Sequence, residues 1–201
     1  MPIQLTTHEV DAAIPKIADG LAKYMWLQSK VTTAPGFHPH PEVQRKFNGF
    51  YRVRRSLEWR TAFFALMDRA HREQLAFHTI LDLLRAATNR YEASFASKLF
   101  ATLNPSAPVI DSVVLKNVGL RIPPVSVTNR ASGILKLHNE LARLFAEFLP
   151  TPSGKDLVQK FDAAYPTAAA VVTPEKKLDF VLWQSRANNA LKGRHAKRAR
   201  P

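Results

Sequence analysis

A chain of 201 residues, 46% of them hydrophobic, is long enough to bury one sizeable core. It contains no cysteine, which excludes a disulfide framework, a zinc–thiolate site, an iron–sulfur cluster and a cysteine nucleophile. No apolar run is long enough to span a bilayer, and residues 1–5 lack the basic start and apolar core of a secretion signal. We therefore expect a soluble intracellular protein of the cytoplasm, nucleoid or nucleus, with no membrane partner.

The charge of the chain is strongly basic and unevenly distributed. The formal net charge is +13. Six of the 29 lysines and arginines lie in residues 186–201, which contain no acid, so the rest of the chain keeps 23 basic against 16 acidic residues. This balance favours a polyanionic partner, and nucleic acid over a membrane, because no basic amphipathic helix with an aromatic membrane face is present. We expect residues 187–201 to form a flexible basic tail that contacts nucleic acid through Arg194, Lys197 and Arg198.

The first part of the chain predicts helices separated by a proline-rich loop. Residues 6–9 (Thr-Thr-His-Glu) fit a capping box, and Pro15 should kink the helix that follows or start its second half. Residues 31–41 contain three prolines and a glycine and should form a loop. His38 and His40 lie in this loop, but no cysteine or close acidic residue completes a metal site, so we expect none there.

A basic and aromatic segment follows at residues 42–55, and Ser56 then caps the next helix. Basic side chains interleaved with aromatic ones can bind phosphates and stack on bases. The alternative is that the aromatic residues pack in the core while the arginines form a solvated face. We expect the aromatic side chains to be buried, and the candidate phosphate contacts in this segment are Arg52, Arg54 and Arg55.

Residues 89–120 form the centre of the predicted fold, as two helices joined by a bend. Apolar residues at helical spacing predict the first helix over 91–103, and Pro105 should stop it. Asp111 then precedes a second helix that begins at Ser112. As the N-cap, Asp111 would accept hydrogen bonds from first-turn amides and stay ionised beside the positive end of the helix dipole. Capping alone would account for this residue, so a catalytic role is permitted and not required.

The remaining sequence also predicts helices, over 129–148, from Ser153, and from Thr173 onwards. Asp179 lies among apolar neighbours in the last helix, and an outward-facing position explains it as well as a functional one. No strand pair, hairpin turn or internal repeat is present, so the expected fold class is all-α. Gly-rich phosphate loops, dinucleotide fingerprints, Gly-x-Ser-x-Gly and His-Glu-x-x-His are also absent, and we expect no cofactor and no metal.

The central stretch resembles a known family. It reads Pro-Val-Ile-Asp-Ser-Val over 108–113, after a helix with Ala-Ser near its start and before a Gly-Leu, and this resembles a divergent member of the helix-hairpin-helix (HhH-GPD) DNA glycosylase superfamily. The resemblance implies a compact multi-helix fold, a hairpin that contacts the DNA backbone, and Asp111 as the catalytic aspartate. The family's hairpin usually carries Gly-x-Gly, whereas this chain has Thr-Asn-Arg-Tyr over 88–91; Asn89 can adopt the left-handed conformation. The lysine nucleophile of bifunctional members has no clear counterpart, because Lys98 lies about two turns into the helix, so lyase activity is not expected.

This resemblance implies contacts to duplex DNA from the hairpin and the helix after it. The residues concerned are Asn89, Arg90, Tyr91, Ser94 and Lys98. We expect one all-helical globule over 1–186, with room for two lobes that meet at residues 89–120. It would excise a damaged or modified base by N-glycosidic hydrolysis, with the flipped base against Trp59, Tyr91 or Trp183.

Two other functions stay open at this point. One is a non-catalytic nucleic-acid-binding module on the same scaffold, in which Asp111 is only a cap. The other is a helical protein-interaction module with a basic tail. A concave pocket lined by Asp111 would favour the glycosylase, a basic face alone would favour the binding module, and the absence of both would favour the interaction module.

Overall fold

Capping residues and prolines determine where the helices begin and end. The computed structural model describes residues 2–33 and 36–185, so the expected tail over 187–201 lies outside the described residues. Within these ranges the chain forms α-helices and one short 3-10 helix, η1, with no strand, which confirms the all-α prediction. The elements are α1 (Thr7–Ala13), η1 (Ile14–Lys16), α2 (Ala18–Thr33), α3 (Pro41–Tyr51), α4 (Leu57–Glu73), α5 (Phe77–Thr88), α6 (Ala93–Leu103), α7 (Ser112–Asn117), α8 (Arg130–Phe148), α9 (Pro152–Ala164) and α10 (Pro174–Gln184).

Several helix starts carry the predicted side-chain caps. The Glu9 amide donates to Thr6 Oγ1 at 3.2 Å and the Glu9 carboxylate accepts from the Thr6 amide at 2.9 Å, so the capping box of α1 is confirmed. Ser56 and Thr173 cap α4 and α10 through their hydroxyl oxygens. Pro15 lies in η1, where it bends the chain between α1 and α2 and interrupts no helix interior.

Three helix starts differ from the predicted positions. α8 begins at Arg130, one residue later than predicted, because Asn129 is its left-handed N-cap (φ 64°). α6 begins at Ala93, two residues later than predicted, because Asn89 adopts a left-handed backbone (φ 55°) and the turn takes up the next residues. α9 begins at Pro152, one residue earlier than predicted, because Thr151 Oγ1 accepts a hydrogen bond from the Gly154 amide at 3.1 Å. Proline suits this first-turn position because its missing amide hydrogen would have no partner there.

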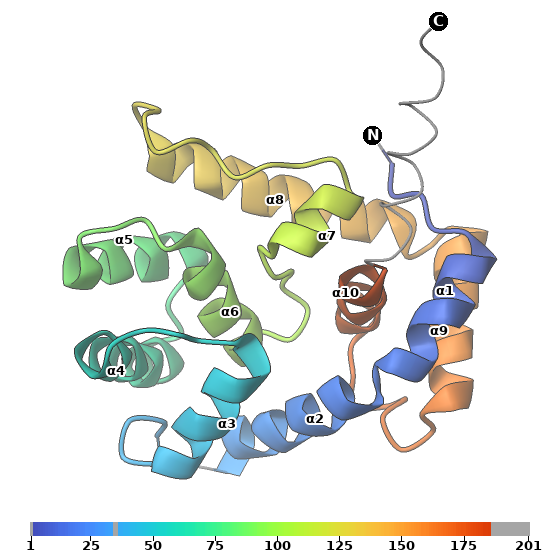
Figure 1. Ribbon diagram of the computed structural model, residues 1–201, viewed down its shortest axis with the longest axis horizontal. Coiled ribbons are helices and arrows are strands. Elements are labelled where there is room, and N and C mark those ends of the chain that lie inside the picture. The colour runs from blue at the N-terminus through green and yellow to red at the C-terminus, as the bar shows by residue number, and fades with distance from the viewer. Residues whose placement is uncertain (1, 34–35, 186–201) are drawn as a thin grey trace, which may run out of the picture.

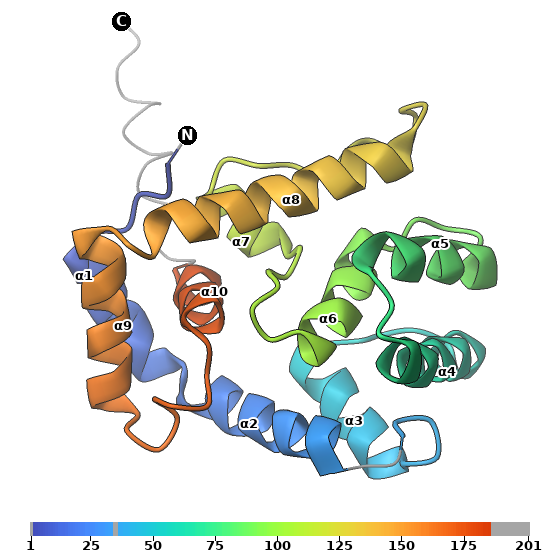
Figure 2. The same ribbon diagram turned by 180° about the vertical axis from the view of Figure 1, so that it is seen from behind.

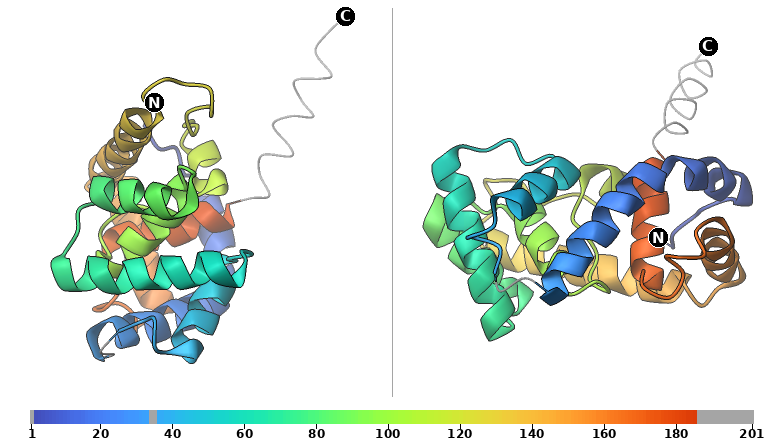
Figure 3. Two further views of the ribbon diagram at one scale, coloured as in Figure 1. Left: turned by 90° about the vertical axis from the view of Figure 1, so that its left-hand side faces the viewer. Right: turned by 90° about the horizontal axis from the view of Figure 1, so that it is seen from below.

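The two ends of the described chain pack together on one side of the molecule. α1 and η1 contact α9 and α10, whereas α4 and α5 form the opposite side (Figures 1 and 2). α8 runs along one edge and contacts α5 and α10, and α2 follows another edge and contacts α3 and α6. When the side that contains α4 and α5 faces the viewer, these two helices lie one above the other (Figure 3, left). One hydrophobic core includes buried residues from both sides and joins them. Among the described helices, none combines the length and apolar character that a membrane span requires.

α6 and α7 lie at the centre, between the two sides (Figure 1). α5 packs on α6, and the turn between them contains Asn89, so the two helices form a helical hairpin. After α6 the chain turns at residues 104–107 and returns to α7, which packs on α10. This path brings the central stretch of the sequence against the last described helix.

Candidate functional site

Asp111 is the N-cap of α7, as predicted. Its Oδ1 accepts a hydrogen bond from the Val113 amide at 2.8 Å, and its backbone carbonyl accepts from the Leu115 amide at 2.8 Å. The preceding Val109 and Ile110 are buried, whereas Asp111 itself is half-buried. The core therefore holds the backbone in place while the carboxylate stays accessible.

Asp111 lines a pocket of about 490 Å³, which we call the Asp111 pocket. The pocket is of the size that small-molecule sites commonly have. Its walls come from η1, α2, α3, α6, the start of α7 and α10. The residues are Lys16, Asp19, Gly20, Lys23, Gly49, Phe50, Tyr51, Arg52, Lys98, Val109, Asp111, Ser112, Val113, Lys176, Asp179, Phe180, Trp183 and Gln184. Asp111 is thus part of a cleft with aromatic walls and several cations, and is not sealed in the core.

Lys98 lines the same pocket from α6. Its Nζ donates to the Tyr51 carbonyl at 3.4 Å and lies 5.3 Å from the centre of the Phe95 ring. Burial lowers the pKa of the Lys98 ammonium, and the Asp111 carboxylate raises it by a smaller amount, so the net shift is downward. Its position two turns into the helix predicted no partnership with Asp111 from sequence, yet the fold brings the two side chains to one pocket.

An ion pair on α10 forms another wall of the Asp111 pocket. Lys176 Nζ lies 2.6 Å from Asp179 Oδ2, and the two residues are 5% and 8% exposed. The outward-facing explanation for Asp179 is therefore wrong. Sequence reasoning missed Lys176 altogether, although a lysine and an aspartate three residues apart in an apolar helix lie on one helix face and can pair.

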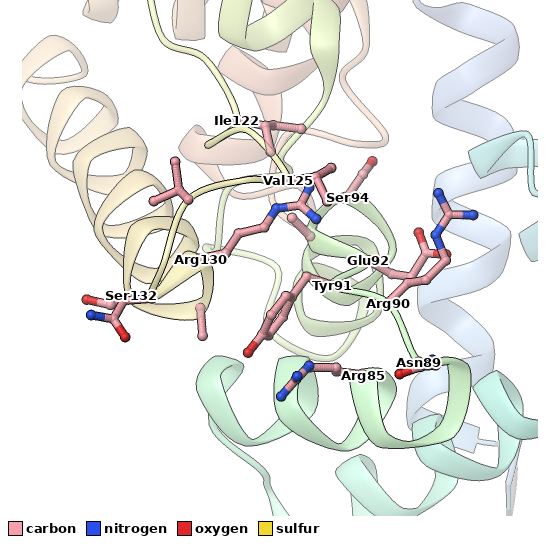
Figure 4. Close-up of a pocket in the computed structure, with 14 residues that line it drawn as sticks. Arg85, Asn89, Arg90, Tyr91, Glu92, Ser94, Ile122, Val125, Arg130 and Ser132 are labelled. Carbon is pink, nitrogen blue, oxygen red and sulfur yellow. The ribbon is translucent and has the colours of Figure 1, made fainter.

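A second cleft, which we call the hairpin cleft, opens where the α5–α6 turn faces the start of α8 (Figure 4). Its volume is about 780 Å³. The lining residues are Arg85, Asn89, Arg90, Tyr91, Glu92, Ala93, Ser94, Ile122, Val125, Val127, Asn129, Arg130, Ala131 and Ser132. Figure 4 shows Arg85 beside the Tyr91 ring and Arg130 extending from α8 towards α6. The Arg85 guanidinium lies 4.6 Å from the centre of that ring.

The hairpin cleft suits an anion. The N-cap residues of α6 and α8 place no side chain on the first-turn amides, so no capping oxygen of their own occupies these donors. Arg85, Arg90 and Arg130 add positive charge to the same cleft. Among the described residues that line it, one is acidic: Glu92, which accepts two hydrogen bonds from Arg55, at 2.9 and 3.0 Å. Uncapped helix starts beside arginines are a favourable environment for phosphate groups.

The two clefts follow one another along α6. Ser94 lines the hairpin cleft and Lys98 lines the Asp111 pocket. These residues are four apart in one helix and so lie on the same face, one turn from each other. The hairpin cleft and the Asp111 pocket are therefore neighbours along α6.

The structure separates the three arginines of the segment 42–55. Arg52 lies at the Asp111 pocket in a left-handed C-cap (φ 54°), with its guanidinium 5.2 Å from the centre of the Trp183 ring. Arg54 is exposed and lines neither cleft. Arg55 forms an ion pair with Glu92, the N-cap residue of α6, and so stabilises the start of that helix. The predicted contacts Arg194, Lys197 and Arg198 lie outside the described residues.

The three aromatic residues that were expected to contact a flipped base also lie in different places. Trp183 lines the Asp111 pocket, and Tyr91 lines the hairpin cleft. Trp59 stacks on Phe63 with ring centres 5.0 Å apart and faces neither cleft. The pocket obtains its other rings from Phe50, Tyr51 and Phe180, which sequence reasoning assigned to the core or left unassigned.

Comparison with known proteins gives no relative: the chain matches no protein-family model, no curated protein and no solved structure. The described residues contain no group of three or more histidine, aspartate or glutamate side chains that could hold a metal ion. The geometry of the two clefts is therefore the basis on which a function can be inferred for this protein.

Proposed function

We propose that this protein binds duplex DNA and releases a base from it by hydrolysis of the N-glycosidic bond, with Asp111 as the catalytic residue. The observation that carries the proposal is the position of Asp111, whose carboxylate caps α7 and lines a ligand-sized pocket one helical turn from a basic cleft. This arrangement combines a site for the DNA backbone with a site for a single extruded base.

Binding is supported by charge and by the hairpin cleft. A chain with a net charge of +13 attracts the phosphate backbone of DNA without regard to its sequence. The uncapped start of α6, with Arg85, Arg90 and Arg130 around it, can accept one or more phosphates and fix the position of the strand. Extrusion of a base costs a few kcal/mol, which such phosphate contacts offset.

The chemistry that Asp111 can perform is electrostatic stabilisation. As the bond between the base and sugar C1′ breaks, the base leaves with the bonding electrons and positive charge develops on the sugar. The Asp111 carboxylate, held by the Val113 amide, can stabilise that charge. Water then adds to C1′ and loses a proton, and the departing base gains one, so the products are a free base and an abasic sugar.

The decisive test replaces Asp111 with Asn, which caps a helix about as well as Asp. We expect unfolding free energy to fall by at most about 1 kcal/mol, through the lost charge–dipole interaction, and DNA binding to survive. Base release from a cognate duplex should fall by orders of magnitude, because a neutral amide cannot balance the developing charge. Both proteins should be assayed on duplexes that each carry one damaged or modified base. Excision by the variant at the wild-type rate would remove Asp111 from the mechanism, and binding without any excision by wild type would favour the non-catalytic module.

One observation supports a second reaction at the same site. A desolvated lysine of lowered pKa is a better nucleophile than an ordinary one, and Lys98 meets that description in the Asp111 pocket. Its amine can condense with the C1′ aldehyde of the abasic product, releasing water and forming an imine. Borohydride would reduce this imine to a stable protein–DNA adduct, which wild type should form and Lys98→Gln should not. A covalent adduct with the variant, or none with an active wild type, would exclude this reaction.

A further inference from the structure

Asp179 carries one carboxylate oxygen that is buried without a partner. Oδ2 binds Lys176 Nζ at 2.6 Å, but Oδ1 has no hydrogen-bond partner among the described residues and is shielded by the surrounding side chains. Asp179 is only 8% exposed. A buried carboxylate oxygen without a donor is costly, and such groups commonly receive one from a ligand or an ordered water.

Lys176 keeps the carboxylate of Asp179 in place. Burial is the largest single influence on the pKa of the Lys176 ammonium and lowers it, but the Asp179 carboxylate, Tyr51 and Tyr24 together raise it by more. The net shift is upward, so Lys176 stays protonated. The same ammonium lies 5.2 Å from the centre of the Tyr24 ring and 5.0 Å from that of Phe180. Rings and carboxylate together surround this cation, so Lys176 orients Asp179 and leaves Oδ1 as the free acceptor.

The walls near this acceptor are flat and aromatic. Phe50, Tyr51, Phe180 and Trp183 line the Asp111 pocket together with Asp179. The glycine at position 49 also lines it, and a Cβ there would meet no heavy atom within 4 Å, so the wall is open at that point. Such walls suit a planar heterocycle, and a fixed carboxylate oxygen discriminates among heterocycles by accepting an N–H from one edge.

We propose that Asp179 Oδ1 accepts a hydrogen bond from an amino or ring N–H group of the base that enters the Asp111 pocket. The inference depends on the proposed function, because it assumes that a base occupies this pocket. It narrows the substrate class to bases with an N–H donor on the entering edge and disfavours bases that offer only acceptors. Asp179 thereby selects the base, Lys176 positions Asp179, and Asp111 acts on the sugar.

The test compares two DNA duplexes that differ only in one base. One carries purine, whose ring nitrogens are only acceptors on the edge concerned, and the other carries 2,6-diaminopurine, which offers amino donors. Each base stands opposite an abasic-site analogue, so neither must break a base pair to be extruded. Wild type should bind the diaminopurine duplex at least about tenfold more tightly, because purine leaves the acceptor unsatisfied. Equal affinities would overturn the proposal.

Asp179→Asn gives the sharper result. The Lys176 ammonium requires an acceptor, so the oxygen of the substituted amide should face it and the amide NH₂ should face the pocket. The variant should then lose the preference for diaminopurine or reverse it in favour of purine. If Asp179 has only a structural role, Asp179→Asn should lower the stability of the protein and leave the ratio of the two affinities unchanged. That result would contradict the proposal.

Two more proteins complete the experiment. Asp82→Asn removes the same charge from an exposed residue that lines neither cleft and should leave the ratio of affinities as in wild type. If Asp179→Asn does not fold, the double variant Lys176→Met with Asp179→Leu replaces the buried pair with apolar side chains, an exchange that folded proteins often tolerate. It should bind both duplexes with equal affinity, and a retained preference would overturn the proposal.

The binding experiment also separates this inference from the proposed function, because binding requires no bond cleavage. A protein that excises no base can still show the preference expected from the Asp179 acceptor. A protein that excises a base but binds the two duplexes equally would contradict the role of Asp179 and leave the proposed function standing.

Discussion

The hydroxyl of Ser97 and the backbone amide of Ile110 form a hydrogen bond that connects α6, which carries Lys98, to the start of α7, which carries Asp111. Ser97 Oγ accepts a hydrogen bond from the Ile110 amide at 2.9 Å and donates one to the Ser94 carbonyl at 3.0 Å, and the residue is fully buried. Ser97 precedes Lys98 in α6, and Ile110 precedes Asp111 at the start of α7. This hydrogen bond therefore determines how the lysine and the carboxylate of the Asp111 pocket are placed relative to each other.

Replacement of Ser97 with Ala should show this connection. The buried Ile110 amide would lose its partner, which costs about 1–3 kcal/mol of unfolding free energy. Base release should fall more than DNA binding, because the hairpin cleft does not include this contact. Urea unfolding and single-turnover kinetics measure the two effects. Ser106→Ala, an exposed change in the same connection, is the control and should alter neither quantity. Wild-type stability in Ser97→Ala would exclude the structural role given to this bond.

His138 should make the stability of the protein depend on pH. It is 6% exposed, its ring stacks on Phe77 with centres 4.0 Å apart, and burial lowers its pKa to about 4 from an ordinary value of about 6.5. Between pH 6.5 and 4 the unfolded chain therefore binds a proton at this histidine, whereas the folded protein does not. The contribution to stability is complete above pH 6.5 and falls by about 3 kcal/mol as the pH approaches 4.

The measurement is urea unfolding between pH 7.5 and 4.5. His138→Phe keeps an aromatic ring against Phe77 and removes the titration, so this variant should lose less stability on acidification than wild type. His78→Gln, at an exposed position, should follow the wild-type curve. Parallel curves for wild type and His138→Phe would show that His138 titrates alike in the folded and unfolded chain.

Two glycine substitutions should have opposite effects on stability. A Cβ at Gly154 would lie 2.3 Å from the Phe148 carbonyl oxygen and 2.6 Å from that of Leu149, so Ala there requires a shift of backbone between α8 and α9. We expect Gly154→Ala to destabilise the protein by about 2 kcal/mol or more. A Cβ at Gly49 meets no heavy atom within 4 Å, and this residue lies inside α3, so Gly49→Ala should stabilise by about 0.5–1 kcal/mol. Equal thermal midpoints for the two variants would contradict this prediction.

The hairpin cleft should determine part of the salt dependence of DNA binding. Each phosphate neutralised by an arginine contributes about 0.9 to the slope of log affinity against log salt concentration. Replacement of Arg85, Arg90 and Arg130 with Gln should therefore reduce that slope by up to about 3. Arg69→Gln with Arg143→Gln is the control, since both side chains are paired with glutamates on their own helices and lie outside the cleft. A larger loss of slope in this control would move the DNA interface to another face.

Local features of the fold could be predicted from sequence, because they depend on neighbours in the chain. The Thr6 capping box, the Asp111 cap and the left-handed Asn89 are each set by residues within one helical turn. Hydrophobic periodicity likewise predicted most helices, with starts shifted by one or two residues where a turn or a cap was not recognised.

The composition of the Asp111 pocket could not be predicted in this way. Lys98 shares the pocket with Asp111 because the chain turns back after α6, and the pair of Lys176 and Asp179 reaches it because α10 packs on α7. Sequence shows that a lysine and an aspartate share a helix face, but it does not show whether that face meets solvent or another helix. The resemblance to the HhH-GPD family concerns residues 108–113 and implies a role for Asp111, but it does not extend to α10.

The position of α10 also has a consequence for the order in which the site is assembled. The parts of the Asp111 pocket range from Lys16 to Gln184, whereas the hairpin cleft needs nothing beyond Ser132. On a ribosome, which adds residues at about five to twenty per second, the basic hairpin emerges seconds before α10 does. A growing chain thus completes the hairpin cleft, the proposed site for the DNA backbone, before the Asp111 pocket, the proposed site for a base.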